Sequence, residues 1–361
     1  MGLQEARYHL RRFLEEETPQ GHAGIKLDLK PSHFDPRDYK YSLIQPQAGI
    51  LSLPAETSNR EHLPGREKKF DQGQFGICTM ASATTGFLAF EAMLGGNYPV
   101  NGLSARYGYA IEKNIDGDPH SAGTTLKICM QVCQQYGVVP DDLYPYAEMT
   151  SDIDLPMPPD TLKPQAEPYK ITTYAQLASV TDNDRSTLAQ QICNAINQEG
   201  PIAVGIIVAE NFFDVKGPDW LVPFPSGRIL GAHAVKLVDY SMTRKAVLTW
   251  NTWGGRWADN DEAWFPFEWF TKYADMGSAI GRIWYLMEAW TATKRTVPKA
   301  ARRIEVTPGS DVLIVDGQKI QMDGKAEIMN DRLMVPLGAI GTNEGYLIER
   351  DGARVILIRP N

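Results

Sequence analysis

The sequence predicts an α+β fold followed by a small β-rich domain. Helical periodicity dominates the first two thirds of the chain, strand-like patterns follow after residue 230, and no regular βαβ alternation links them. Beyond residue 303 short Val/Ile/Leu runs alternate with Asp-Gly pairs, a pattern typical of hairpins. We therefore expect a helical lobe and a β-rich lobe in one domain, with a separate domain at the C-terminus.

Individual elements follow from apolar spacing and from the residues that stop each run. The clearest helical pattern begins at Cys78 and ends before Gly95-Gly96, a pair that commonly terminates helices. Residues 26–69 are rich in proline and lack a long periodic stretch, which predicts an extended lead-in. Helices are expected over 1–20, 78–94, 124–136 and 186–198, and strands over 202–209, 233–240, 246–251 and 263–269.

A change of composition predicts the domain organisation. Residues 292–303 carry five Lys or Arg residues around Pro298 and almost no apolar side chains, as expected of a linker. We expect an N-terminal helix and lead-in over 1–33, the main α+β domain over 34–291, the linker over 292–303 and the β-rich domain over 304–361.

Composition excludes several classes of protein. Of the 361 residues 43% are hydrophobic and 22% charged, which is ordinary for a soluble chain that forms a packed core. The net charge of -8 argues against a general nucleic-acid binder. No apolar run approaches the ~20 residues that a membrane span needs. The polar, acidic start is unlike a signal peptide and favours the cytoplasm.

A cysteine at the start of a helix is the first chemical signal. The loop Asp71–Ile77 contains two glycines and runs directly into the helix that Cys78 begins. Unpaired N–H groups and a partial positive charge at a helix N-terminus stabilise a thiolate, so the pKa of a thiol placed there falls. The alternative is a buried structural cysteine, the common state of a free thiol.

Two later residues favour the catalytic interpretation. His233 lies at the start of an expected strand, and Asn251 follows it by 18 residues. A nucleophilic cysteine needs a general base, and the base needs a partner that orients it. Cysteine, histidine and asparagine in this chain order match the papain-like arrangement.

On these motifs the sequence resembles the papain family of cysteine peptidases, particularly its bacterial members. The resemblance implies a two-lobed papain-like fold and covers roughly residues 34–290. Several ordered motifs are more specific than any one of them. The matching segments are the lead-in Phe34–Tyr39, the loop and cysteine of Asp71–Cys78, the Tyr136–Tyr146 stretch after a helix, the histidine strand Gly231–Tyr240 and the Asn-Thr-Trp-Gly box Asn251–Gly254.

The resemblance also implies a role for each residue of the site. Cys78 is then the nucleophile, and His233 is the general base and later the acid. Asn251 orients the imidazole, and Trp253 shields the bond between them from water. Gln72 donates its side-chain amide to the oxyanion beside the Cys78 backbone N–H. Such donors stabilise the transition state because they are fixed in advance.

The remaining candidates carry weaker signals. Gly123 is the single candidate for the glycine pair that lines the substrate cleft in the family. Cys129 and Cys133 stand at i and i+4, a spacing that a metal could use, but they lie on an apolar helix face, and Cys193 adjoins another. Free cysteines on such faces pack in the core. The histidines form no metal-type cluster, so we expect no metal and no cofactor.

Three segments of the tail can be matched to a known domain: Val315–Gly317, Asn330–Leu337 and Glu349–Ile358. On these segments the tail resembles the small β domain found at the N-terminus of copper amine oxidases. No His or Cys follows residue 233, so a copper site in the tail is not expected. We expect a module that stabilises the peptidase domain, docks on it or docks on another surface. Both resemblances point to an extracellular destination, against the cytoplasm that the N-terminus favours.

Together these features predict a cysteine endopeptidase that acts on a peptide or protein through a thioester acyl-enzyme. One alternative is a papain-fold protein that binds peptides without cutting them, although a binder needs none of Cys78, His233, Asn251 and Gln72. The other is an acyl transferase or amidase that uses the same residues, because the acyl-enzyme is common to both reactions.

Overall fold

The computed structural model describes most of the chain between residues 69 and 293. Of the helix expected over 1–20, only positions 10 and 14 are described. The described ranges are 10, 14, 21–22, 24–33, 35, 38, 40–41, 53–65, 69–182, 184–275, 282–293, 303–306, 310, 312–315, 318–321, 327–329, 332–334, 347–351 and 354–358.

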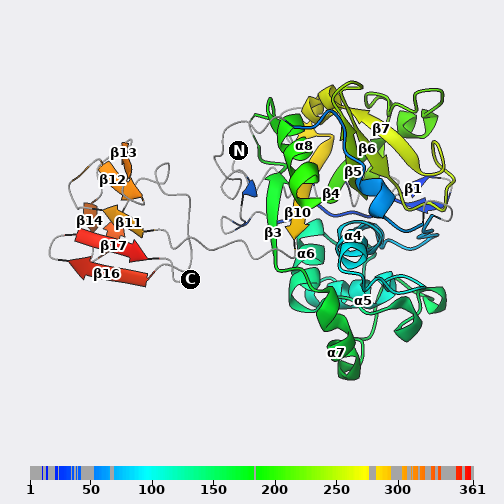
Figure 1. The fold of residues 1–361 in the computed structure, drawn as a ribbon, viewed down its shortest axis with the longest axis horizontal. Helices are drawn as coiled ribbons and strands as arrows, with labels where there is room; N and C mark the ends of the chain where they lie inside the picture. The colour runs from blue at the N-terminus through cyan, green and yellow to red at the C-terminus, as the bar shows by residue number, and fades with distance from the viewer. Residues whose placement is uncertain are drawn as a thin grey trace. The chain divides into compact units, whose positions relative to one another are not determined.

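The chain divides into two compact units. The first comprises Met1–His33 and Tyr39–Thr296, and the second Phe34–Asp38 and Val297–Asn361. Residues 1–33, which we expected to precede the main domain, therefore belong to the same unit as the expected catalytic residues. The helical and β-rich parts of this first unit give the α+β class that the sequence predicts (Figure 1).

An antiparallel six-stranded sheet forms the β-rich part of the first unit, in the order β3-β10-β4-β5-β6-β7. Strand β4 has the bounds that the apolar run predicts, and β5 is longer than expected at both ends. Strand β10 continues two residues past the expected domain boundary at 291. The six strands are β3 (Thr173–Ala178), β4 (Ile202–Ala209), β5 (Ile229–Ser241), β6 (Ala246–Trp250), β7 (Glu262–Pro266) and β10 (Leu286–Thr293).

The helix expected over 78–94 is in fact two helices, α3 (Cys78–Thr84) and α4 (Phe87–Leu94). The hydroxyl of Thr85 donates back to the Ala81 carbonyl at 2.6 Å, a contact that bends helices. A Cβ on Gly86 would lie 2.4 Å from the Ser82 carbonyl oxygen, so the tight turn between the helices requires glycine. The apolar spacing survives this break, which is why the sequence pattern conceals it.

Helices α5, α6 and α7 complete the helical part, which Figure 1 shows on one side of the sheet. Helix α8 does not belong to this group and packs directly on the sheet. Helices α6 and α8 match the expected ones within two residues at each end. Helix α5 was not predicted because Gly108 interrupts its pattern, and Met80 packs where a Cβ of Gly108 would be. The helices are α5 (Ala105–Ile115), α6 (Leu126–Gln135), α7 (Lys163–Ala166) and α8 (Leu188–Glu199).

Short elements connect these. Residues 263–269, expected as one strand, divide between β7 and the 3-10 helix η8. The 3-10 helices are η2 (Asn59–His62), η3 (Asp141–Leu143), η4 (Tyr146–Glu148), η5 (Asp160–Leu162), η6 (Glu167–Tyr169), η7 (Glu210–Asp214) and η8 (Phe267–Thr271), and the short strands are β1 (Gly21–His22), β2 (Ile25–Lys26), β8 (Tyr273–Asp275) and β9 (Arg282–Trp284).

Hydrophobic cores lie on both faces of the sheet. Along β4, Ala203 and Ile207 join the cluster beneath the helices, whereas Val204 and Ile206 join the cluster beneath α8. A strand buried on both faces reads as a continuous apolar run, as the sequence of β4 does. Strand β4 is therefore packed on both of its faces. None of the helices in the described part of the chain is long and apolar enough to cross a membrane.

The second unit contains a five-stranded antiparallel sheet in the order β13-β12-β11-β17-β16, and a β14-β15 pair. Val315 pairs with Gln318 and Asp351 with Arg354, so each of two Asp-Gly signals coincides with a hairpin. The third Asp-Gly pair, 323–324, falls between β13 and β14, which are not partners. The strands are β11 (Arg303–Val306), β12 (Val312–Val315), β13 (Gln318–Gln321), β14 (Glu327–Met329), β15 (Arg332–Met334), β16 (Leu347–Asp351) and β17 (Arg354–Ile358).

Candidate active site

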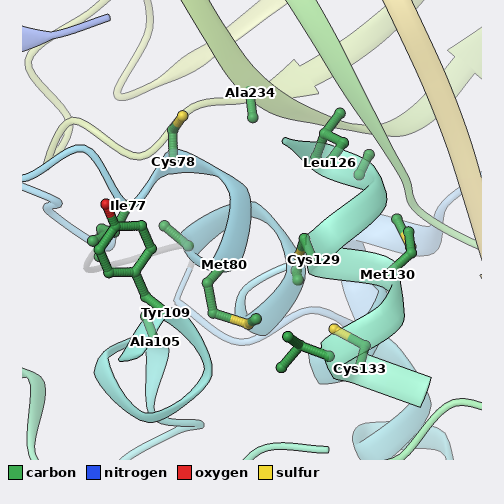
Figure 2. Packing of buried hydrophobic residues seen from close by; sticks show 14 of the residues in the cluster. Ile77, Cys78, Met80, Ala105, Tyr109, Leu126, Cys129, Met130, Cys133 and Ala234 are labelled. Carbon is green, nitrogen blue, oxygen red and sulfur yellow. The ribbon is translucent and has the colours of Figure 1, made fainter. Parts of the chain in front are cut away.

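Cys78 is the first residue of α3, as the sequence predicts, and Ile77 is the N-cap. Its side chain points toward β5, where Ala234 lies beside it (Figure 2). A hydrogen bond from the Ala234 backbone reaches the sulfur. The thiol is 1% exposed, so it is covered in this structure.

His233 and Asn251 meet through the pairing of β5 and β6. Trp250 lies opposite Lys236 in that pair, which brings Asn251, the next residue, to the side chain of His233. The imidazole Nε2 lies 2.8 Å from the Asn251 Oδ1, so Nε2 carries the proton and donates it. Nδ1 is buried without a hydrogen-bond partner. This leaves Nδ1, on the strand that borders Cys78, as the basic atom of the ring.

Trp253 stacks on the imidazole. The two ring centroids are 4.7 Å apart with an interplanar angle of 26°, and the indole is fully buried. An apolar ring at this distance excludes water from one face of His233 and from its bond to Asn251. The geometry fits the shielding role that the family resemblance implies.

Gln72 is fully buried and held at both ends of its amide. Its Nε2 donates to the Phe75 carbonyl at 3.1 Å, and its Oε1 accepts from the Thr252 hydroxyl at 2.6 Å. An amide nitrogen has two hydrogens, so one is available to an oxyanion. Our sequence reasoning missed Thr252, although its position between Asn251 and Trp253 is a usable signal.

Burial sets the protonation of Cys78 and His233. Together with a smaller effect of the nearby Asp28 and Glu112 carboxyl groups, it raises the pKa of the Cys78 thiol to about 12. Burial also lowers the pKa of His233 to about 4. We expected the helix N-terminus to lower the thiol pKa, but desolvation outweighs it here. In this closed structure the pair is a neutral thiol and a neutral imidazole at pH 7.

A buried carboxylic acid lies near Cys78 and was not predicted. Glu112 of α5 accepts from the hydroxyl of Thr79, the residue after Cys78, at 2.9 Å. Burial raises the pKa of Glu112 to about 8, so it is largely protonated at pH 7. A charged Glu112 would oppose a thiolate at Cys78, whereas the neutral acid does not.

An N-terminal segment passes through the site between its two sides. The Leu29 N–H donates to the Ala232 carbonyl at 3.1 Å, and the Ala232 N–H donates to the Leu27 carbonyl at 3.1 Å. On the other side the Lys30 N–H donates to the Thr124 carbonyl at 2.9 Å. Residues 27–30, here called the cleft segment, thus pair with the residue before His233. No local pattern in the sequence predicts this pairing.

Gly123, our substrate-cleft candidate, lies directly beneath the cleft segment. A Cβ on Gly123 would be 1.8 Å from the Asp28 carbonyl oxygen, and its φ of +73° also favours glycine. Asp28 lies beside Gly76 too, since a Cβ there would be 2.8 Å from its Oδ2. Gly123, two residues before the N-cap of α6, therefore permits the close approach of an extended chain.

Leu29 fills a space that another glycine leaves open. Its Cδ2 lies 2.7 Å from the position of a Cβ on Gly205, in β4. Leu126 of α6 and Glu288 of β10 border the same position. Leu29 is 2% exposed, so the side chain is buried against both the helical part and the sheet.

The other cysteines lie away from this chemistry. Cys129 and Cys133 are fully buried in the cluster beneath the helices (Figure 2), and Cys193 is fully buried in the cluster beneath α8. Within the described ranges no group of three or more His, Cys, Asp or Glu residues is placed to hold a metal ion. The packing of these thiols agrees with the interpretation of the sequence.

Comparisons with known proteins find a related sequence and similar folds. An uncharacterized peptidase C1-like protein of Acanthamoeba polyphaga mimivirus is 25% identical over 63% of this chain and 71% of its own length. Xylellain, a cysteine protease from Xylella fastidiosa, has a similar fold, with a TM-score of 0.55 and 21% identity over 74% of this chain and 96% of that one. Procathepsin B S9 from Trypanosoma congolense covers 74% of this chain and 83% of its own at 16% identity and a TM-score of 0.49.

Family models match both parts of the chain. The copper amine oxidase N-terminal domain matches residues 281–358, a range that begins inside the first unit and includes β10. The papain family cysteine protease model matches residues 69–268, more than half of the chain, and this range contains Gln72, Cys78, His233 and Asn251. This chain therefore belongs to the papain family of cysteine proteases.

Proposed function

We propose that this protein is a cysteine endopeptidase that cleaves peptide bonds through a thioester on Cys78, with His233 as base and acid and Asn251 as the orienting partner. The observation that carries the proposal is the 2.8 Å bond between His233 Nε2 and Asn251 Oδ1, which leaves Nδ1 unpaired. An imidazole held in this tautomer can accept a proton from a thiol.

Acylation uses the groups in order. The Cys78 thiol gives its proton to Nδ1 of His233, and the sulfur attacks the carbonyl carbon of the scissile bond. The carbonyl oxygen becomes an oxyanion, for which the free hydrogen of Gln72 Nε2 and the Cys78 N–H at the start of α3 are the proposed donors. His233 then protonates the departing amine, and a thioester remains.

Deacylation uses the same groups with water as the attacking molecule. Water replaces the amine, and His233 removes one of its protons as the oxygen attacks the thioester carbonyl. The tetrahedral intermediate uses the same two donors. Its collapse releases the carboxylic acid and returns the proton to the Cys78 sulfur, so the enzyme is restored.

The cleft segment must leave before a peptide can bind. Ala232 and Thr124 present their backbone groups to residues 27–30, and these groups cannot pair with a substrate at the same time. Departure of the segment also admits water to Cys78 and His233. The desolvation that separates their pKa values then weakens, which favours the thiolate–imidazolium pair.

Incubation of the full chain with casein, followed by mass spectrometry of the products, tests the proposal. Cys78→Ala is the test variant, and Cys193→Ala, which removes a buried thiol in α8, is the matched control. We expect internal cleavage by the wild type and by Cys193→Ala, and none by Cys78→Ala. Trimming from the ends alone would contradict the endopeptidase assignment. Transfer to an added amine without hydrolysis would indicate an acyl transferase.

A further inference from the structure

The loop between β6 and β7 carries three parts of the catalytic apparatus. Asn251 binds His233, Trp253 stacks on the imidazole, and the Thr252 hydroxyl holds the Gln72 amide. A shift of this loop would therefore disturb both the base and the proposed oxyanion donor.

The same loop has an unfavourable backbone conformation. Ala258, Asn260 and Asp261 have φ values of 49°, 53° and 64°, in the left-handed region that residues other than glycine rarely adopt. Such a conformation persists when surrounding contacts over-determine it. Contacts within the loop or with the residues beneath it must therefore hold these three residues in place.

Asp261 supplies those contacts from inside the loop. Its Oδ2 accepts the N–H groups of Trp253 at 2.8 Å and Gly255 at 2.9 Å, and its Oδ1 accepts that of Trp257 at 3.3 Å. Its own backbone adds two bonds, from the Asn251 N–H at 2.8 Å and to the Trp257 carbonyl at 2.7 Å. The side chain is fully buried, so water does not substitute for any of these bonds.

We infer that Asp261 is a positioning residue, whose carboxylate fixes the loop so that Asn251 and Trp253 hold His233 in its reactive orientation. The inference rests on the proposed function and extends it to a residue that the sequence motifs do not mark. Its physical basis is one carboxylate that accepts three backbone N–H groups from the stretch Trp253–Trp257. Bonds from N–H groups to a carboxylate are stronger than those to a neutral acceptor.

Glycine separates the two possible roles of Asp261. Asp261→Gly removes the carboxylate but suits a φ of 64° better than aspartate does. If the residue served the turn alone, this variant would be neutral. Asp261→Asn keeps one oxygen for Trp253 and Gly255 and presents an NH2 group to the Trp257 N–H, so it should lie between the wild type and Asp261→Gly.

Asp239 provides a matched control. It is also a buried aspartate, and it accepts the backbone N–H groups of Asn59 at 2.6 Å and Arg60 at 3.2 Å, at the other end of β5. Asp239→Asn should therefore lower stability without moving the catalytic loop. Lys236, whose charge reaches both His233 and Asp261, is unchanged in every variant.

Two measurements on the full chain test the inference. The first is kcat and KM for a peptide that the wild type cleaves. The second is the ratio of the iodoacetamide labelling rates of Cys78 at pH 6 and pH 9, followed by peptide mapping. This ratio reports how well His233 supports the thiolate below the ordinary pKa of a thiol, and it needs no turnover.

We expect Asp261→Gly to lower kcat on the order of 100-fold with KM little changed, as small displacements of catalytic groups do. The labelling ratio should fall roughly tenfold, which corresponds to one pKa unit. Asp261→Asn should show a smaller fall in both, and Asp239→Asn neither. Wild-type kcat and ratio in Asp261→Gly would overturn the inference. If that variant does not fold, equal ratios in Asp261→Asn and Asp239→Asn would overturn it.

The labelling arm separates this inference from the proposed function. If the wild type cleaves no peptide, the endopeptidase assignment fails, whereas a ratio that falls in the Asp261 variants still supports the positioning role. If the wild type cleaves peptides and the Asp261 variants match it in both measurements, the proposed function stands and the inference fails.

Discussion

Loss of the Leu29 side chain should expose Cys78. The leucine anchors the cleft segment over Gly205 and is buried. Truncating a buried leucine to alanine costs about 2–5 kcal/mol. If the substitution weakens docking of the segment by about 2 kcal/mol, the population of undocked molecules rises roughly 30-fold. Leu29→Ala should therefore react at Cys78 at least about 30-fold faster than the wild type.

The pKa of the thiol makes this increase measurable. Burial raises the pKa of Cys78 from an ordinary value of 9.0 to about 12. At pH 7 the thiolate fraction is then roughly 10⁻⁵, against roughly 10⁻² for an unperturbed thiol. The docked state thus contributes little to alkylation, and the observed rate follows the undocked population.

Iodoacetamide labelling at pH 7, read by peptide mapping, measures the rate for Cys78 beside those for Cys129, Cys133 and Cys193. The control is Leu248→Ala, which truncates a buried leucine of β6 in a different core cluster. We expect Leu29→Ala to accelerate labelling of Cys78 alone, and Leu248→Ala to leave it near the wild-type rate. An unchanged rate in Leu29→Ala, or an equal increase in Leu248→Ala, would refute the reasoning.

Four further outcomes follow from the same geometry. Gln72→Ala should cost about 3 kcal/mol of transition-state stabilisation, seen in steady-state kinetics as a lower kcat; a change confined to KM would contradict the oxyanion role. Burial raises the pKa of Asp28, so docking of the cleft segment is strongest below the ordinary carboxyl pKa of 3.8 and weakens as the pH rises through the raised value. Because asparagine carries no charge, Asp28→Asn should strengthen docking and slow Cys78 labelling at pH 7. Faster labelling of this variant would show that the Asp28 charge does not weaken docking. Gly205→Val should displace the cleft segment, since its Cβ would lie 2.7 Å from the Leu29 Cδ2, and labelling no faster than in the wild type would show that the segment tolerates it. A chain that ends at Thr296, the end of the first unit, should keep its turnover of small peptides. A melting temperature many degrees lower, with activity lost, would show that residues 297–361 stabilise the first unit.

Local patterns determined much of the architecture. The apolar run of β4, the helix that begins at Cys78 and the glycine that ends α8 all depend on residues a few positions apart. Two hairpins of the tail followed from Asp-Gly pairs for the same reason. The ordered motifs around Cys78, His233 and Asn251 also sufficed to indicate the family, which the family model confirms.

Elements whose cause lies elsewhere in the chain escaped prediction. The break between α3 and α4 depends on the Thr85 hydroxyl and the crowding at Gly86, which apolar spacing does not report. Helix α5 contains Gly108 because Met80 packs against it. The boundary near 291 was placed by composition, whereas β10 continues to Thr293 because it pairs with β3.

The sequence by itself was enough to predict which residues would carry the chemistry and to indicate the family, because the matching motifs are short and contiguous. Tertiary structure alone decided the protonation states of these residues and the hydrogen bonds that hold them in place. The Thr252 bond to Gln72 joins residues 180 positions apart, and the cleft segment meets β5 some two hundred residues later in the chain. Burial, which reverses the expected direction of the Cys78 pKa, is a property of everything packed around the thiol. Desolvation and long-range hydrogen bonds arise only when distant segments come together, so no local pattern encodes them.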